Sequence, residues 1–290
     1  MKIVVIVGPT GVGKTKLSIE LAKYLDAVVM NGDSMQVYRG LDIGTAKIKE
    51  EEKDGIEHYL FDIVSVNDNY TIYDYQRDGR KLLDEWKKEN RNVVIVGGSG
   101  LYLKSLLYDY KFNEEENLDN FDNLTNEEIL REIEKVHKTD IHINNRKRLI
   151  RELNKIKNNS VIQSDINKPL YDFITIGLTS DRDTLYDVVN KRVDLMFSDG
   201  LVEEVQSFYE KNIRSKAIKT GIGYKELYDY FDNKISLEEA RELIKKNTRH
   251  FIKRQYTFFN NQMQVNWINT NFDNFNETID KAKELIKEQD

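Results

Sequence analysis

The chain contains no cysteine and only two prolines, and none of its apolar runs is long enough to cross a bilayer. The absence of cysteine excludes disulfides, thiolate metal ligands and a cysteine nucleophile. The apolar N-terminus is too short for the core of a signal peptide, and we interpret it as a first strand. These absences predict a soluble cytoplasmic protein with no membrane partner.

The charge of the chain is unevenly distributed. The formal net charge of −6 argues against a nucleic-acid partner, since such proteins usually carry a basic surface. The basic residues nevertheless gather in two clusters, which are Arg146, Lys147, Arg148, Arg151, Lys155 and Lys157, and Lys245, Lys246, Arg249, Lys253 and Arg254. Such clusters are commonly solvated helix faces, and they are also what an RNA partner requires. Charge alone leaves both interpretations open.

Strands and helices alternate in the first hundred residues. Buried strands are expected at 3–7, 27–30 and 93–96, and the helical spacing of apolar residues predicts an amphipathic helix at 72–88. Such alternation is typical of a parallel sheet covered by helices, with ligands at the carboxyl ends of its strands. We therefore predict an α/β fold.

The second half of the chain indicates a further subdomain. From 113 the sequence becomes polar and helix-rich, and a buried strand at 173–178 then resumes the first pattern. We predict an inserted, mostly helical subdomain at 113–169 within a core formed by 1–112 and 170–290. The core ends in a helical C-terminal region, whose longest helix is expected at 237–262.

A glycine-rich segment follows the first strand and reads Gly8-Pro9-Thr10-Gly11-Val12-Gly13-Lys14-Thr15. It fits G-x-x-x-x-G-K-[ST] between a strand and a helix, the context in which this pattern forms a phosphate-binding loop. The glycines allow a tight turn that points N–H groups inward, and the helix adds its positive end. We expect Lys14 to contact a terminal phosphate and the Thr15 hydroxyl to ligate Mg²⁺. The segment predicts a P-loop NTPase-like core that binds a di- or triphosphate.

The aspartate that holds Mg²⁺ in ordinary ATPases is missing from the expected strand end. The strand at 93–96 ends in Gly-Gly-Ser, and the best acidic candidate is Asp33, directly after the second strand. A carboxylate there would lie near the phosphate loop and act as a general base. A lone aspartate after glycine equally forms a turn or a helix cap. The residues by themselves leave both roles open.

Histidine offers little chemistry in this chain. His58 and His137 have no second ligand at metal spacing. We therefore interpret His58 as a structural hydrogen-bonding residue near the edge of the sheet.

Several segments, in order along nearly the whole chain, resemble the tRNA dimethylallyltransferases, also called tRNA isopentenyltransferases. They are 8–15, 33–47, 58–62, 97–102, 146–153, 223–226 and 248–255. The most specific of them is Asp33-Ser34-Met35-Gln36-Val37-Tyr38-Arg39-Gly40-Leu41-Asp42-Ile43-Gly44-Thr45-Ala46-Lys47. The phosphate loop alone marks only a very large superfamily.

The resemblance implies transfer of a dimethylallyl group from dimethylallyl diphosphate to N6 of adenine 37. This adenine lies directly 3′ of the anticodon in tRNAs that read UNN codons, and diphosphate is the second product. The phosphate loop would then hold a diphosphate leaving group, with Lys14 and Mg²⁺ stabilising its charge. Asp33 would accept the N6 proton, and Ser99, commonly threonine in the family, would assist with its hydroxyl.

The same resemblance implies that tRNA is the partner and that its target adenine is extruded from the anticodon stem-loop. The insertion at 113–169 would then be a tRNA-binding subdomain. The residues implied to contact tRNA are Asp33, Ser34, Met35, Gln36, Ser99, Lys147, Arg148, Arg151, Thr220, Gly223, Tyr224, Lys225, Lys253, Arg254 and Gln255. We expect a monomer.

Three other functions stay open at this point. An isopentenyltransferase that modifies free AMP, ADP or ATP is disfavoured by the basic insertion and by the length of the chain. A P-loop small-molecule kinase would consume ATP without prenyl transfer. A non-catalytic nucleotide switch would keep its activity after Asp33→Ala.

Overall fold

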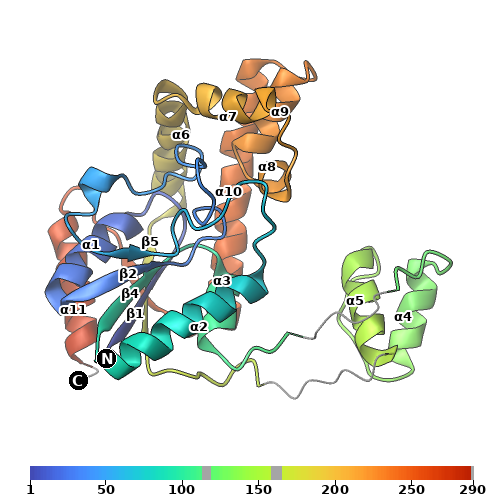
Figure 1. Ribbon diagram of the computed structural model, residues 1–290, viewed down its shortest axis with the longest axis horizontal. Helices are drawn as coiled ribbons and strands as arrows, with labels where there is room; N and C mark the ends of the chain where they lie inside the picture. The colour runs from blue at the N-terminus through green and yellow to red at the C-terminus, as the bar shows by residue number, and fades with distance from the viewer. Residues whose placement is uncertain (113–118, 158–164, 289–290) are drawn as a thin grey trace. The chain divides into compact units, whose positions relative to one another are not determined.

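The computed structural model describes residues 1–112, 119–157 and 165–288. The chain divides into two compact units (Figure 1). Unit 1 comprises Met1–Tyr108 and Asn167–Asp290, and unit 2 comprises Asp109–Ile166. The insertion expected from the sequence spans 113–169, of which 113–118 and 158–164 lie outside the described residues.

The described strands of unit 1 form one parallel sheet in the order β3-β2-β4-β1-β5-β6. They are β1 (Ile3–Val7), β2 (Ala27–Asn31), β3 (His58–Tyr59), β4 (Asn92–Val96), β5 (Ile174–Thr179) and β6 (Asn266–Asn269). Their register places Val4 of β1 beside Val94 on one side and Ile174 on the other. All five residues of β1 and the middle three of β4, Val93–Ile95, are buried and β-branched, as expected for a parallel sheet covered on both faces.

Helices cover both faces of this sheet (Figure 1). Those of unit 1 are α1 (Lys14–Leu25), α2 (Ile72–Glu89), α3 (Gly100–Leu107), α6 (Arg182–Ser198), α7 (Leu201–Glu210), α8 (Lys216–Thr220), α9 (Tyr224–Phe231), α10 (Leu237–Gln262) and α11 (Phe275–Lys287), with a 3₁₀ turn η1 (Glu50–Glu52). Successive strand residues point to opposite faces. Val4 therefore packs in a core with α1 and α11, and Val5 packs in a second core with α2 and α3.

Helix α10 has the bounds 237–262 predicted from the sequence. A reciprocal capping box fixes its start, because the Ser236 hydroxyl accepts from the Glu239 N–H at 3.2 Å and the Glu239 carboxylate accepts from the Ser236 N–H at 2.7 Å. Farther along, the Gln255 side chain donates to the carbonyl of Gly98, just beyond β4, at 3.1 Å. The helix thus passes the carboxyl edge of the sheet.

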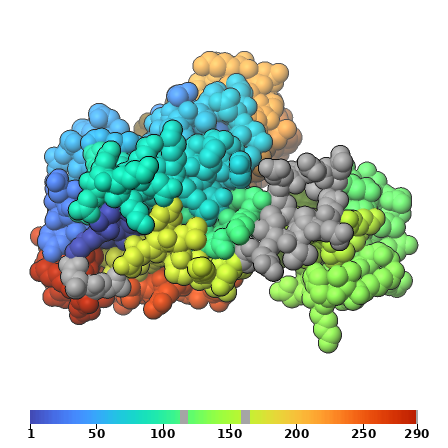
Figure 2. All heavy atoms as spheres, turned by 60° about the horizontal axis from the view of Figure 1, so that its bottom comes forward, coloured from blue at the N-terminus to red at the C-terminus, as the bar shows by residue number. Residues whose placement is uncertain are grey.

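The chain leaves unit 1 and returns to it at adjacent points. Tyr108 pairs with Pro169, and the Leu170 N–H donates to the Leu107 carbonyl at 2.8 Å. The returning segment lies beside α2 (Figure 2). The Tyr171 hydroxyl donates to the Asp84 carboxylate of that helix at 3.4 Å. These contacts close unit 1 on either side of the insertion.

Unit 2 contains the helices α4 (Asn126–Glu134) and α5 (Arg146–Lys157). Its core consists of the buried residues Phe121, Ile129, Ile133, Leu149 and Leu153. The Arg146 guanidinium donates to the carbonyls of Leu124 and Phe121 at 2.9 and 2.8 Å. Arg146, a member of the first basic cluster, therefore joins the loop ahead of α4 to α5.

Among the described residues, no helix is both long enough and apolar enough to span a membrane.

His58 lies in the edge strand β3, and its Nδ1 donates to the Ile56 carbonyl at 2.8 Å. This bond confirms the structural interpretation of His58.

Candidate active site at the carboxyl edge of the sheet

The glycine-rich segment forms a tight loop between β1 and α1, as predicted. Gly8 has φ of +133°, and a Cβ at this position would lie 2.4 Å from the Leu178 carbonyl oxygen of β5. A Cβ at Gly13, where φ is +91°, would lie 2.5 Å from the Phe275 ring. Only glycine fits both positions. Pro9, Thr10, Gly11 and Val12 complete the loop.

Lys14 begins α1 and turns its side chain back onto the loop. Its Nζ donates to the Pro9 carbonyl at 2.6 Å. Burial lowers the pKa of Lys14 to about 7, with a further lowering by Arg192 and an opposing effect of Asp33. Thr15, the next residue, is exposed. The lowered pKa means that the charge of Lys14 is only partly balanced by Asp33. A bound phosphate group would supply the missing negative charge.

Asp33 lies just beyond β2 and shares this environment. Its N–H donates to the Asn31 side chain at 2.8 Å, and its Oδ1 accepts from the Met35 N–H at 2.8 Å. The turn role considered from the sequence is therefore present. Burial raises the pKa of Asp33, and the Met35 N–H and the charge of Lys14 only partly offset it. A half-buried carboxylate with a raised pKa beside a phosphate loop has the properties of a general base.

Ser99 precedes α3 and joins the loop after β4 to the loop after β2. Its Oγ accepts from the Ser34 N–H at 2.9 Å and donates to the Ser34 hydroxyl at 3.1 Å. The Gly32 N–H donates to Val96 of β4 at 2.8 Å. Because β2 and β4 are neighbours in the sheet, Asp33 and Ser99 lie on adjacent loops, as the strand-end argument predicts.

Arg192 of α6 is a member of the site that the sequence reasoning missed. It is half-buried, and among the described residues it has no hydrogen-bond or ion-pair partner. Burial lowers its pKa, opposed by the carboxylate of Asp33, and its charge in turn lowers the pKa of Lys14. The available signal was an arginine on the apolar stripe of a helix, three residues after the buried Val189. Lys14 and Arg192 are thus two basic side chains whose charges act on Asp33.

Two buried side chains, Asn31 and Tyr75, support the backbone at Asp33. Asn31 is fully buried, and its amide donates to the carbonyls of Asp33 and Leu60, each at 2.9 Å. Tyr75 donates to the Asn31 carbonyl at 2.9 Å and stacks on Tyr102 with ring centroids 4.5 Å apart. These contacts fix the backbone that carries the carboxylate.

The residues implied to contact tRNA differ in their exposure. Thr220, Lys253 and Arg254 are exposed in unit 1, and Lys147, Arg148 and Arg151 are exposed on α5 of unit 2. The half-buried members are Ser34, Met35, Gln36, Ser99 and Lys225. Gly223, Tyr224 and Gln255 are buried, and the side chains of Tyr224 and Gln255 bond to Glu204 and Gly98. In this conformation the side chains of Tyr224 and Gln255 therefore contact other parts of the protein and are not exposed on its surface.

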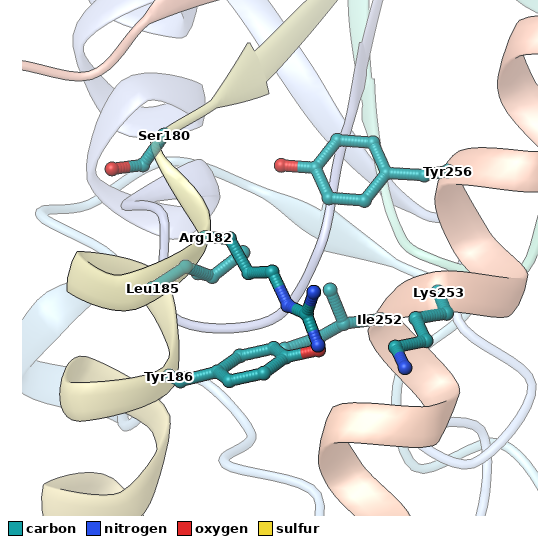
Figure 3. Close-up of a pocket in the computed structure, with 7 residues that line it drawn as sticks. All are labelled: Ser180, Arg182, Leu185, Tyr186, Ile252, Lys253 and Tyr256. Atoms are coloured by element: carbon teal, nitrogen blue, oxygen red, sulfur yellow. The ribbon is translucent and has the colours of Figure 1, made fainter.

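Lys253 also borders a cavity of about 300 Å³ between α6 and α10 (Figure 3). Arg182 lies over the Tyr186 ring at 5.1 Å, and the Tyr256 hydroxyl bonds to Thr179 at 2.8 Å. Two exposed acidic residues flank Arg182 in the sequence: Asp181, the N-cap of α6, and Asp183 in its first turn. The charged side chains that line the cavity, Arg182 and Lys253, are both basic.

In residues 1–112, 119–157 and 165–288, no group of three or more histidine, aspartate or glutamate side chains is placed to hold a metal ion. The phosphate loop offers the exposed hydroxyl of Thr15 instead. Mg²⁺ commonly takes one or two protein ligands and completes its octahedron with phosphate oxygens and water. The donors present therefore fit an ion that binds together with a diphosphate.

Comparison with known proteins adds independent information. The family model described as IPP transferase matches residues 36–262. A protein named tRNA dimethylallyltransferase, from Bacillus mycoides (strain KBAB4), is 44% identical over 282 residues, which cover 92% of this chain and 89% of that protein.

Solved structures give the same family. The tRNA isopentenylpyrophosphate transferase of Bacillus halodurans is 38% identical with a TM-score of 0.77, covering 99% of this chain and 95% of that chain. The transferase of the same kind from Staphylococcus epidermidis is 35% identical with a TM-score of 0.77 and full coverage of both chains. A eukaryotic dimethylallyltransferase acting on tRNA is 26% identical with a TM-score of 0.79, over 92% of this chain and 74% of that one. The matched length, the shared fold and the site at the sheet edge together show that this chain belongs to the IPP transferase family.

Proposed function

We propose that this protein transfers the dimethylallyl group of dimethylallyl diphosphate to N6 of adenine 37, in tRNAs that read UNN codons, and releases diphosphate. One observation carries the proposal: the carboxylate of Asp33 shares its electrostatic environment with Lys14 of the phosphate loop and with Arg192. A carboxylate at this position can accept the proton that an amine loses as it is alkylated. The similarity to tRNA dimethylallyltransferases favours this reaction over nucleotide hydrolysis.

The diphosphate side of the reaction uses the loop and its two cations. Breaking the allylic C–O bond leaves negative charge on the diphosphate, and groups already aimed at that charge lower the barrier. The loop N–H groups, Lys14 and Arg192 would hold these oxygens. The Thr15 hydroxyl would hold Mg²⁺, which when bound supplies further neutralisation of the phosphate charge.

The acceptor side uses Asp33. The exocyclic amine of adenine is a weak nucleophile because its lone pair is delocalised into the ring. As the new C–N bond forms and the C–O bond breaks, one N6 proton passes to the Asp33 carboxylate. The Ser99 hydroxyl, bonded to Ser34 at 2.9 Å, holds the loop that presents this carboxylate.

The tRNA side uses exposed cations. Lys253 and Arg254 lie on α10, and Lys147, Arg148 and Arg151 lie on α5. Phosphate contacts from such residues supply affinity that offsets the cost of extruding the target base, a few kcal/mol. The acceptor implies a cytoplasmic location, and we expect the protein to act as a monomer.

The test is a transfer assay with the purified full chain, Mg²⁺, dimethylallyl diphosphate and an anticodon stem-loop with adenines at positions 36 and 37. We expect mass spectrometry to find one dimethylallyl group on adenine 37. The same stem-loop with guanine at position 37 is the control and should gain nothing. Transfer to free AMP or ATP in preference to the stem-loop would contradict the proposal, as would ATP consumption without prenyl transfer.

A further inference from the structure

Glu204 of α7 is the centre of an unusual set of hydrogen bonds. Its carboxylate accepts from the backbone N–H groups of Asp42, Ile43 and Gly44 at 3.1, 2.7 and 3.2 Å. It also accepts from the Tyr224 hydroxyl of α9 at 2.6 Å. Three successive N–H groups directed at one anion form a backbone nest, and here the anion is a side chain of the protein itself.

The loop held by Glu204 is tied to the segment 33–36. The Gln36 side chain donates to the Thr45 carbonyl at 3.0 Å. The Thr45 hydroxyl donates to the Leu41 carbonyl at 2.6 Å, and the Lys47 ammonium donates to the Tyr38 carbonyl at 2.8 Å. The nest at 42–44 therefore anchors one side of the segment whose other side carries Asp33.

Tyr224 links the same carboxylate to the stretch 220–225. Its ring is fully buried and lies against Gly44, where a Cβ would be only 2.6 Å from the ring. Burial and Glu204 raise the pKa of Tyr224, so the phenol keeps the proton that it donates. The start of α9 is fixed in turn, because Glu226 accepts from the Gly223 N–H at 2.8 Å. Two stretches implied to contact tRNA thus meet at Glu204.

We infer that Glu204 is a positioning residue for the acceptor, which sets the geometry of the segments 33–36 and 220–225 without touching either substrate. This inference rests on the proposed function, since it concerns the binding of tRNA at that same site. Neither Glu204 nor Tyr224 bonds to the phosphate loop in the described structure. Glu204 therefore should affect the binding of tRNA and not the binding of diphosphate.

The carboxylate matters because all four of its partners are donors. Glu204→Gln keeps the size of the side chain but replaces one acceptor oxygen by an NH₂ group, which faces donors and leaves at least one N–H unpaired. Losing a charge-assisted bond of this kind weakens the dependent binding step by about tenfold or more. Glu203 is a matched control, because it is the exposed neighbour on the same helix and Glu203→Gln changes the net charge equally.

The experiment measures transfer kinetics for the wild type, Glu204→Gln, Glu203→Gln and Tyr224→Phe, with the anticodon stem-loop varied at saturating dimethylallyl diphosphate. For Glu204→Gln we expect the KM for the stem-loop to rise about tenfold, with kcat lowered by less than about threefold. Tyr224→Phe should raise the KM by a smaller factor, and Glu203→Gln should match the wild type. Diphosphate affinity, measured by calorimetry, should be equal in all four proteins.

An unchanged KM in Glu204→Gln would overturn the inference while leaving the proposed function intact. A parallel loss of diphosphate affinity would overturn it too, because general destabilisation would then explain the result. If the wild type and Glu203→Gln transfer nothing, the proposed function fails first and the inference falls with it.

Discussion

The binding of diphosphate should depend on pH through Lys14. Burial lowers the pKa of this ammonium to about 7, so it is largely neutral at pH 8 when the loop is empty. A bound diphosphate favours the charged form and raises that pKa. Binding therefore takes up a proton, is strongest below pH 7, and weakens as pH rises through 7.

The size of the effect follows from the titration. With a pKa of about 7, the charged fraction of Lys14 falls from about nine-tenths at pH 6 to about one-tenth at pH 8. Affinity for diphosphate should therefore fall about tenfold over this range because of Lys14 alone. Proton uptake on binding should approach about 0.9 at pH 8.

Calorimetry with diphosphate and Mg²⁺, repeated in buffers of different ionisation enthalpy, measures both the affinity and the proton uptake. Lys14→Gln is the control, because it keeps the chain length near that of lysine but has no ammonium to titrate. Any pH dependence that remains in Lys14→Gln belongs to the diphosphate and to other titrating groups of the site, such as Asp33. The same pH dependence in both proteins would refute the account of Lys14.

Two further predictions concern stability. Gly8→Ala should lower the free energy of unfolding in urea by at least about 2 kcal/mol, because the new Cβ would meet the Leu178 carbonyl. The control Gly55→Ala has a φ of +74° but open space around it, and should lower this free energy by only about 1 kcal/mol. Equal losses in the two variants would contradict the close packing of the loop. Leu149→Ala should destabilise unit 2 by about 2–5 kcal/mol and speed its proteolysis, with diphosphate binding unchanged, and a protease pattern like that of the wild type would contradict the assigned core.

The sequence predicted the framework of the fold well where the hydrophobic pattern was strong. The strands at 3–7 and 93–96 are uninterrupted apolar runs because helices cover both of their faces, and the structure has them within one residue. Helix α10 has the bounds predicted from the sequence, and in the structure a capping box at Ser236 fixes its start. The helical insertion was visible from its polarity and lack of strand period.

Other features depend on tertiary contacts that no local pattern reports. Strand β3 has only two residues, too few for a period, and forms because it pairs with the edge of β2. Arg192 and Glu204 lie on helices far along the chain from the loops they face. The resemblance implied that Tyr224 contacts tRNA, but its side chain is buried in the structure. The sequence could not show this, because the exposure of a side chain depends on tertiary packing.

The central claim is that Asp33 accepts the proton of the target amine while the phosphate loop holds the diphosphate. The most direct test compares the wild type with Asp33→Asn in single-turnover transfer to the anticodon stem-loop. Asparagine keeps an oxygen for the Met35 N–H but is a far weaker base. We predict that the transfer rate falls by about 10²–10⁴ while affinity for diphosphate stays within about threefold. Transfer at the wild-type rate by Asp33→Asn would contradict the claim.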